Sequence, residues 1–209
     1  MQNIYLSDIS EFVGEREFFL TVLTEKERER ITGYKDANAK LRSLVGSVMI
    51  SAFTGKGDIL YGEYGKPYIT GAPFFNLSHS GDSVVLFVCD DAEVGIDIET
   101  IRPISEKIAE KIFTEKERIY AKEIFSAEIA YIALWTIKES AAKCVGRGII
   151  SPKKQAIDLI NENSFRFGGK KIYYKCFFVG DKVVTACSTA HITADIKKTL
   201  ASAIKSRLT

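Results

Sequence analysis

This sequence has no large excess of charge of either sign and no long apolar runs. Its 209 residues include 29 basic and 27 acidic ones, for a formal net charge of +2. Such a balance argues against wholesale binding to nucleic acid or to a membrane, so any site for a polyanion has to be local. No uncharged stretch reaches membrane-spanning length, and the first residues lack a basic start followed by an apolar segment. We therefore expect a cytoplasmic protein with no nucleic-acid and no membrane partner.

Cysteine is also scarce. The four cysteines show no CxxC spacing and lie in apolar stretches, at Cys89, Cys144, Cys176 and Cys187. This pattern favours reduced core residues over a zinc site or a disulfide framework. With 46% of its residues hydrophobic and 27% charged, the chain has enough apolar material for one large globular domain or two small ones.

Three short patterns occur twice, in the same order. They are TEKER at 24–28 and 114–118, Gly-x-Gly at 55–57 and 146–148, and Gly-Asp-x-Val-Val at 81–85 and 180–184. TEKER has the Thr and Glu spacing of a capping box, which opens a helix. Gly-x-Gly follows a long helical pattern each time, as expected for a helix stop, and the third pattern predicts a tight turn that leads into a strand.

The repeated patterns predict an α+β fold made of two similar halves. We expect residues 1–100 to form the first half and residues 101–209 the second, related by a pseudo-twofold axis, each with a sheet packed against a long helix. The junction is placed near Pro103, since proline ends a strand. The alternative is that unrelated helix starts and turns converge on the same residue types.

Two acids lie close together in the stretch VGIDIET, at Asp97 and Glu99, within a run that is otherwise typical of a buried strand. Side chains alternate between the faces of a strand, so both carboxylates point one way while Ile96 and Ile98 point into the other layer. Like charges this close raise each other's pKa, and a buried carboxylate without a partner is costly. A cation bound against both acids is therefore expected.

The second long helical pattern places Trp135, Glu139 and Lys143 four residues apart, and thus on one face. An exposed Glu-to-Lys pair is one explanation, and such a pair contributes only about 0.3–0.5 kcal/mol. The rest of this helix is apolar nearly all round, which favours a partly buried groove for Glu139 and Lys143.

Combined, Asp97, Glu99 and Glu139 supply oxygen ligands without sulfur or imidazole. Such ligands suit Mg²⁺, or Mn²⁺, better than zinc. Magnesium held by carboxylates keeps positions open for water and for phosphate oxygens, and Lys143 would add positive charge for those oxygens. These residues predict a phosphate-transfer site.

Other residues fit a groove that binds anions. The segment FFNLSHSGD places His79 between Ser78 and Ser80, in an expected turn just before a strand. A structural role in the turn is the alternative for this histidine, and the two hydroxyls favour phosphate contact. Lys66 lies in a Gly-Lys-Pro turn, a weak signal by itself, and Arg42 early in the first long helix also fits a solvated surface charge.

Neither half carries a complete set of these residues. Where an acid pair would recur in the second half, Asp195 is followed by Lys197, and residues 41–54 of the first long helix contain no acid. A lysine cannot replace a carboxylate that binds a metal ion, because its ammonium repels the ion. We expect one composite site per chain and an active monomer.

These elements resemble the Sfp-type 4′-phosphopantetheinyl transferases. The matching segments, in the order and at the spacing of that family, are GKP at 65–67, FNLSHSG at 75–81, GIDIE at 95–99 and WTIKESAAK at 135–143. Together they make a specific signature, which covers roughly residues 42–148. The resemblance also implies a pseudo-twofold α+β fold.

The reaction implied by this resemblance moves the phosphopantetheine arm of coenzyme A to a serine hydroxyl of an acyl or peptidyl carrier protein, with release of 3′,5′-ADP. Asp97, Glu99 and Glu139 would hold Mg²⁺ on the pyrophosphate. Lys143 would bind and polarise the phosphate under attack, and Glu139 would act as base for the carrier serine, directly or through water. The residues implied to bind the nucleotide are Arg42, Lys66, Ser78 and His79, with Arg42 and His79 on its 3′-phosphate.

Two other classes of protein share parts of this pattern. A metal-dependent nuclease also combines acids with a lysine beside a phosphate, but it normally needs a broad basic surface and places its Glu and Lys two apart on a strand. A catalytically silent scaffold that binds carrier proteins would be expected to have lost an acid, and all three acids are present.

Overall fold

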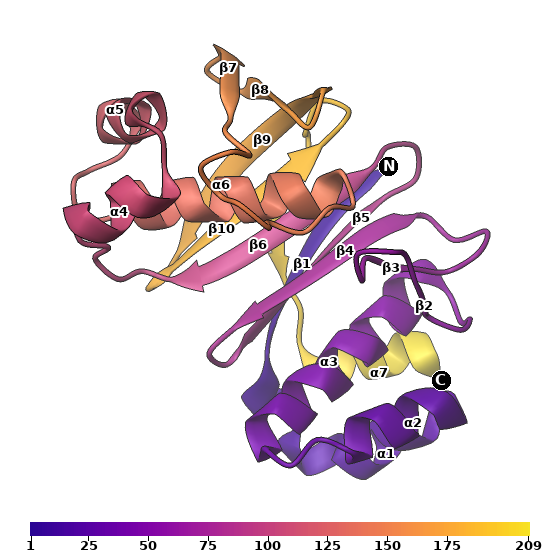
Figure 1. The fold of residues 1–209 in the computed structure, drawn as a ribbon. Helices are drawn as coiled ribbons and strands as arrows, with labels where there is room; N and C mark the ends of the chain where they lie inside the picture. The colour runs from indigo at the N-terminus through magenta and orange to yellow at the C-terminus, as the bar shows by residue number, and fades with distance from the viewer.

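The computed structural model describes residues 1–209, apart from the side chain of residue 160, and shows the mixed α+β fold that the sequence predicts (Figure 1). The helices are α1 (Arg16–Thr21), α2 (Glu25–Thr32), α3 (Ala37–Thr54), α4 (Glu106–Ile112), α5 (Glu115–Ile124), α6 (Ala130–Cys144) and α7 (Ala201–Leu208), with a 3₁₀ segment η1 (Ile9–Glu15) before α1. None of the helices in the described part of the chain combines the length and apolar character of a membrane span.

The strands form two larger sheets and one short hairpin. The first sheet has the order β11 (Ile196–Lys198), β1 (Gln2–Asp8), β5 (Ser83–Cys89), β4 (Phe74–Ser80). The second has the order β6 (Val94–Thr100), β10 (Lys182–Ser188), β9 (Lys170–Val179), β8 (Ser164–Phe167), β7 (Asp158–Asn161). The hairpin joins β2 (Leu60–Tyr61) to β3 (Pro67–Tyr68).

The two sheets pack face to face, with helices on their outer sides (Figure 1). Between them lies an apolar core to which β1 and β5 contribute Ile4 and Phe87 while β6 and β10 contribute Ile96 and Val184, all fully buried. A second core fills the space between α3 and the outer face of the first sheet, and a third lies between α6 and the second sheet. The long helices α3 and α6 therefore lie on opposite outer sides of the pair of sheets.

The repeated patterns fold into matching elements. Thr24 and Thr114 are the N-caps of α2 and α5, and in each the hydroxyl accepts a hydrogen bond from the backbone N–H of the Glu three residues on. The Glu117 carboxylate also accepts from the Thr114 N–H at 2.8 Å, which completes the capping box in the second copy. Gly81 and Gly180 have φ of +56° and +59°, in turns that lead into β5 and β10. The predicted helix starts and turns are confirmed; the symmetry axis stays a prediction.

Two strands connect the parts of the chain in a way that the repeat does not predict. β6, at the end of residues 1–100, pairs with β10 and so belongs to the second sheet. In return, β11 pairs in parallel with β1, and α7 packs its buried Ile204 into the first core. Each sheet is thus completed by a segment from the other half of the sequence.

One local prediction is wrong. The sequence predicts a turn at His79, and His79 lies instead in strand β4, which is antiparallel to β5. The turn comes only at the following Gly81. Asn76 and Ser78 are polar and buried here because they face other polar groups rather than solvent. Their polarity conceals the strand from pattern analysis, which expects apolar residues at buried strand positions.

The cysteines are free, as expected, among the residues that the structure describes. Cys89, Cys144 and Cys187 are buried, and Cys176 packs against the core beneath α6. Burial raises the pKa of Cys144 and of Cys176 to about 12, so these thiols stay protonated at neutral pH. They are packing residues rather than nucleophiles.

Candidate active site

Strand β6 directs its two acids toward helix α6. Asp97 is level with Thr185 of β10, and the Thr185 hydroxyl is hydrogen-bonded to that of Thr136 on α6. Ile96 and Ile98 point the opposite way, into the core between the sheets. The predicted alternation along VGIDIET is therefore confirmed.

Gly95 allows α6 to approach this face of the strand closely. A Cβ atom at this position would lie 2.0 Å from the Ser140 carbonyl oxygen and 2.3 Å from the Cys144 backbone nitrogen. Both atoms are helix backbone, so they cannot move out of the way as a flexible side chain could. The glycine thus sets the spacing that lets side chains of α6 reach those of β6.

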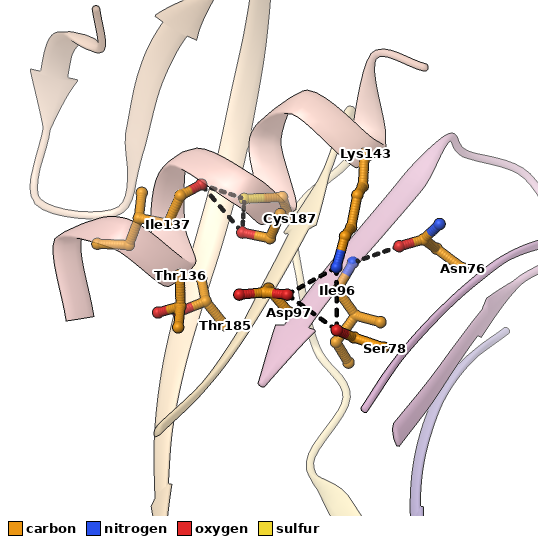
Figure 2. Close-up of polar contacts among 10 residues, drawn as sticks. Asn76, Ser78, Ile96, Asp97, Thr136, Ile137, Lys143, Thr185 and Cys187 are labelled. Atoms are coloured by element: carbon orange, nitrogen blue, oxygen red, sulfur yellow. Dashed lines mark hydrogen bonds and ion pairs between the residues drawn. The ribbon is translucent and has the colours of Figure 1, made fainter. Parts of the chain in front are cut away.

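A short chain of polar contacts joins α6, β6 and β4 (Figure 2). The Lys143 ammonium donates to Asp97 Oδ1 at 2.6 Å and to the Ser78 hydroxyl oxygen at 2.9 Å, and that hydroxyl donates to the same carboxylate oxygen at 2.8 Å. Asp97 is buried, and its other oxygen, Oδ2, has no hydrogen-bond partner among the described residues. A buried carboxylate oxygen without a donor is costly unless a cation binds it.

The three acids lie around one hollow of about 630 Å³, whose lining includes Asp97, Glu99, Trp135, Glu139 and Lys143. The predicted shared face of α6 is confirmed, since its three members all line the hollow. Burial raises the pKa of Glu99 and of Glu139, and the neighbouring Asp97 charge raises both further. The unfavourable proximity of these carboxylates favours binding of a positive charge.

The side chains as they stand do not form a closed metal site: within the described chain, no three histidine, cysteine or acidic residues cluster closely enough to hold an ion. Their chemistry nevertheless fits a hard divalent cation. Asp97 Oδ2 is unpartnered, and Glu99 and Glu139 line the same hollow. Lys143 forms an ion pair with Asp97 at 2.6 Å, so one positive charge already lies beside the carboxylates.

The same hollow is also lined by basic residues. Arg42 of α3 lines it and donates to the Gly81 carbonyl at 3.3 Å, and His79 of β4 lines it as well. Burial by the surrounding walls lowers the pKa of His79, and the Arg42 and Lys143 charges lower it further. Arg30 of α2, which no sequence pattern indicated, also lines the hollow and donates to Ser43 and Ser47 of α3 at 2.9 Å each. The lining of the hollow thus combines acidic and basic side chains.

A second hollow, of about 270 Å³, adjoins the first and shares Glu139 and Lys143 with it. Lys66 of the β2–β3 hairpin lines it, as does Gly146 just after α6. The Lys66 ammonium donates to the carbonyl of Cys144 at the end of α6 at 2.9 Å, and burial lowers its pKa. This lysine therefore ties the hairpin to the helix that carries Glu139 and Lys143.

Two polar residues support the site in a way that the sequence did not predict. Asn76 accepts a hydrogen bond from the Ile96 N–H at 3.0 Å and so joins β4 to β6 (Figure 2). Lys138, next to Glu139, is fully buried and forms an ion pair with Glu117 of α5 at 2.5 Å. The buried position of Lys138 could have been predicted from its apolar neighbours on the helix, since a lysine among them needs a buried partner.

Comparison with known proteins identifies relatives of this chain. Residues 93–194 match the model of the 4′-phosphopantetheinyl transferase superfamily. The chain is 37% identical over 145 residues to the 4′-phosphopantetheinyl transferase gsp of Aneurinibacillus migulanus, which covers 64% of this chain and 61% of that protein. It is 34% identical over 150 residues to the transferase Sfp of Bacillus subtilis strain 168, which covers 66% of each chain. A further B. subtilis 4′-phosphopantetheinyl transferase is 33% identical over 151 residues, or 66% of this chain and 67% of that protein.

Fold and site define a mixed α+β protein with a charged cleft, in which an acid-bearing strand faces a helix that carries Glu139 and Lys143. The match to these relatives is specific enough to name the family. The chain belongs to the 4′-phosphopantetheinyl transferase superfamily.

Proposed function

We propose that this protein transfers the 4′-phosphopantetheine arm of coenzyme A to a serine hydroxyl of an apo acyl or peptidyl carrier protein, releases 3′,5′-ADP and depends on Mg²⁺. The observation that carries the proposal is a hollow lined by three acids and Lys143 together with Arg42 and His79. Coenzyme A has matching parts: a pyrophosphate that binds a metal ion and a nucleotide with a further phosphate. Membership of the family supports the same reaction.

Asp97, Glu99 and Glu139 would hold the Mg²⁺ ion, or Mn²⁺ in its place. Bound there, the ion would neutralise charge on the pyrophosphate and stabilise the leaving group. The unpartnered Asp97 Oδ2 and the raised pKa values of Glu99 and Glu139 support this assignment, because a nearby dication would favour the ionised form of all three acids.

Glu139 is the proposed base for the carrier serine, directly or through a water molecule. Its carboxylate lines the same hollow as Lys143 and can accept the serine proton as the hydroxyl attacks. Arg42, Ser78 and His79 would bind the nucleotide, with Arg42 and His79 on its 3′-phosphate. Lys66 lines the adjoining hollow and would contact the nucleotide from there.

Lys143 is proposed to stabilise charge on the phosphate as the serine attacks it. The Lys143→Ala variant is expected to lower kcat by about 100- to 1000-fold while KM for coenzyme A changes much less, as for other groups that act on the transition state. Steady-state kinetics at saturating coenzyme A measure the effect. Lys170→Ala, which removes an exposed partner of Glu93, is the matched control and should keep the wild-type rate. An unchanged kcat in Lys143→Ala would remove this lysine from catalysis.

The direct test of the function is to incubate the protein with coenzyme A, Mg²⁺ and an apo carrier protein and then to weigh the carrier. A gain equal to one phosphopantetheine arm, with formation of 3′,5′-ADP, supports the proposal. A carrier that binds the protein and gains no mass would indicate a silent scaffold. Loss of phosphodiester bonds from added DNA or RNA would indicate a nuclease.

The arrangement further predicts one coenzyme A site per chain and a fully active monomer. The acids come from β6 and α6 of one chain, and Arg42 comes from α3 of the same chain. Calorimetric titration is expected to give one coenzyme A per chain, and the rate per chain should stay constant on dilution. Two equivalent sites, or a rate that falls as a dimer dissociates, would contradict this prediction.

A further inference from the structure

The second hollow contains a cation that neither the predicted site nor the proposed roles use. Lys66, Lys143 and Arg147 line this hollow together with a single acid, Glu139. Lys66 and Lys143 are engaged, with the Cys144 carbonyl and with Asp97. The Arg147 side chain, in contrast, is exposed beside them. A hollow with three cations and one acid favours a negatively charged ligand.

The end of α6 fixes where Arg147 lies. Gly146 has φ of +68°, which a glycine adopts without strain, and its N–H donates to the Lys143 carbonyl at 3.2 Å. The Arg147 N–H donates to the Ala142 carbonyl at 2.9 Å. This pair of hydrogen bonds is a Schellman motif, which turns the chain sharply at the helix end. It places Arg147 three residues beyond the last residue of the helix that carries Glu139 and Lys143.

Gln155 holds the loop that follows. Its side-chain oxygen accepts from the backbone N–H groups of Ile150 and Ser151 at 2.8 and 3.0 Å, and its side-chain nitrogen donates to the Gly148 carbonyl at 3.1 Å. One glutamine thereby joins three points of the loop next to Arg147.

The loop is in turn anchored in the core. The Gln155 carbonyl accepts from the Lys138 ammonium at 2.9 Å, and Lys138 is fully buried in its ion pair with Glu117. The Glu117 carboxylate also accepts from the N–H of Ile157, two residues after Gln155, at 2.9 Å. Removing a partner from a buried ion pair is costly, so this pair is a stable point of attachment. The loop is therefore attached to α6 through Lys138 and to α5 through Glu117.

From these contacts we propose that Arg147 binds a phosphate group of the coenzyme A donor and that Gln155 positions it. This inference rests on the proposed function, and it adds an anion-binding residue to the same site. A guanidinium is suited to this role because it presents several N–H groups to phosphate oxygens. Coenzyme A offers two sources of the same chemistry, its pyrophosphate and its 3′-phosphate.

The test is calorimetric titration of the full-length protein with coenzyme A and with 3′-dephospho-coenzyme A, both with Mg²⁺. Arg147→Ala is expected to weaken coenzyme A binding by about 10- to 100-fold, as for the loss of a hydrogen bond to a charged group. Lys154→Ala removes an exposed cation from the same loop and is the matched control. An equal loss with both donors assigns Arg147 to the pyrophosphate. A loss seen with coenzyme A alone assigns it to the 3′-phosphate.

Gln155→Ala gives the second measurement. It removes the three hydrogen bonds of the Gln155 side chain to the loop and keeps the backbone carbonyl that accepts from Lys138. It is expected to weaken binding less than Arg147→Ala does, with an unchanged melting temperature. Since Gln155 acts through Arg147, the double variant should bind no more weakly than Arg147→Ala alone. If the two single losses of coenzyme A affinity multiply in the double variant, Gln155 does not act through Arg147 and the positioning role is overturned.

The remaining outcomes separate this inference from the proposed function. Wild-type protein that binds coenzyme A, with Arg147→Ala no weaker than Lys154→Ala, overturns the inference alone. Wild-type protein that binds coenzyme A tightly through Arg147 and transfers no arm to a carrier overturns the proposed function and leaves the phosphate contact standing. A wild-type protein that binds no coenzyme A overturns both.

Discussion

Asp97→Asn is expected to lower the rate of arm transfer by about a thousandfold or more, which is the loss of several kcal/mol of metal-ion stabilisation. The amide keeps the shape of the carboxylate and can still accept from Ser78 and Lys143, so the fold should be retained. It lacks the charge needed to bind a dication beside Glu99 and Glu139. The rate is measured by mass spectrometry of the carrier protein.

Metal binding can be followed separately from activity. Binding of Mn²⁺ to the complex with coenzyme A, measured by electron paramagnetic resonance, should weaken in parallel with the rate. Asp181→Asn removes an exposed acid from the turn before β10 and should leave both measurements unchanged. Full activity of Asp97→Asn at ordinary Mg²⁺ concentrations would show that the metal assignment is wrong.

Gly95→Ala is the second change with a large expected effect. The added Cβ would collide with the backbone of α6 at Ser140 and Cys144, so the helix has to move outward. Overpacking of this kind typically lowers the free energy of unfolding by about 1–3 kcal/mol. A displacement of roughly 1 Å would also separate Glu139 from Asp97, and misplacement of that size can lower a rate by about 100-fold. Thermal unfolding and transfer kinetics measure the two effects.

Gly14→Ala is the matched control, because nothing lies within 4 Å of a Cβ atom at that position. It should change the melting temperature and the rate very little. If Gly95→Ala unfolds at the wild-type temperature and transfers at the wild-type rate, the close approach of α6 to β6 is not what positions the acids.

Much of the site could be predicted because its residues obey short-range rules. The alternation of a strand places Asp97 and Glu99 on one face, and the helical period places Trp135, Glu139 and Lys143 on another. The capping residues Thr24 and Thr114 mark helix starts by local hydrogen bonds alone. In each of these features, every residue lies within four positions of the next one.

The rest depends on contacts between residues far apart in the sequence. Ser78 and Asn76 are buried on a strand because Lys143, Asp97 and the Ile96 N–H give them partners. Strand propensity disfavours such residues, so the pattern predicts a turn instead. The ion pair of Lys138 with Glu117 joins residues 21 positions apart, and only the packing of α5 on α6 brings them together.

The parallel pairing of β1 with β11 has a consequence for synthesis of the protein. Ile4 is level with Ile196 in this pairing, so β1 is synthesised 196 − 4 = 192 positions ahead of the strand that covers this edge. Domains generally fold as units during synthesis, and contacts of long sequence separation form slowly. The first sheet can assemble from β1, β5 and β4 earlier, with one edge of β1 still open. An open edge is a template for pairing with other chains, so the nascent protein is most exposed to aggregation until β11 and α7 close it.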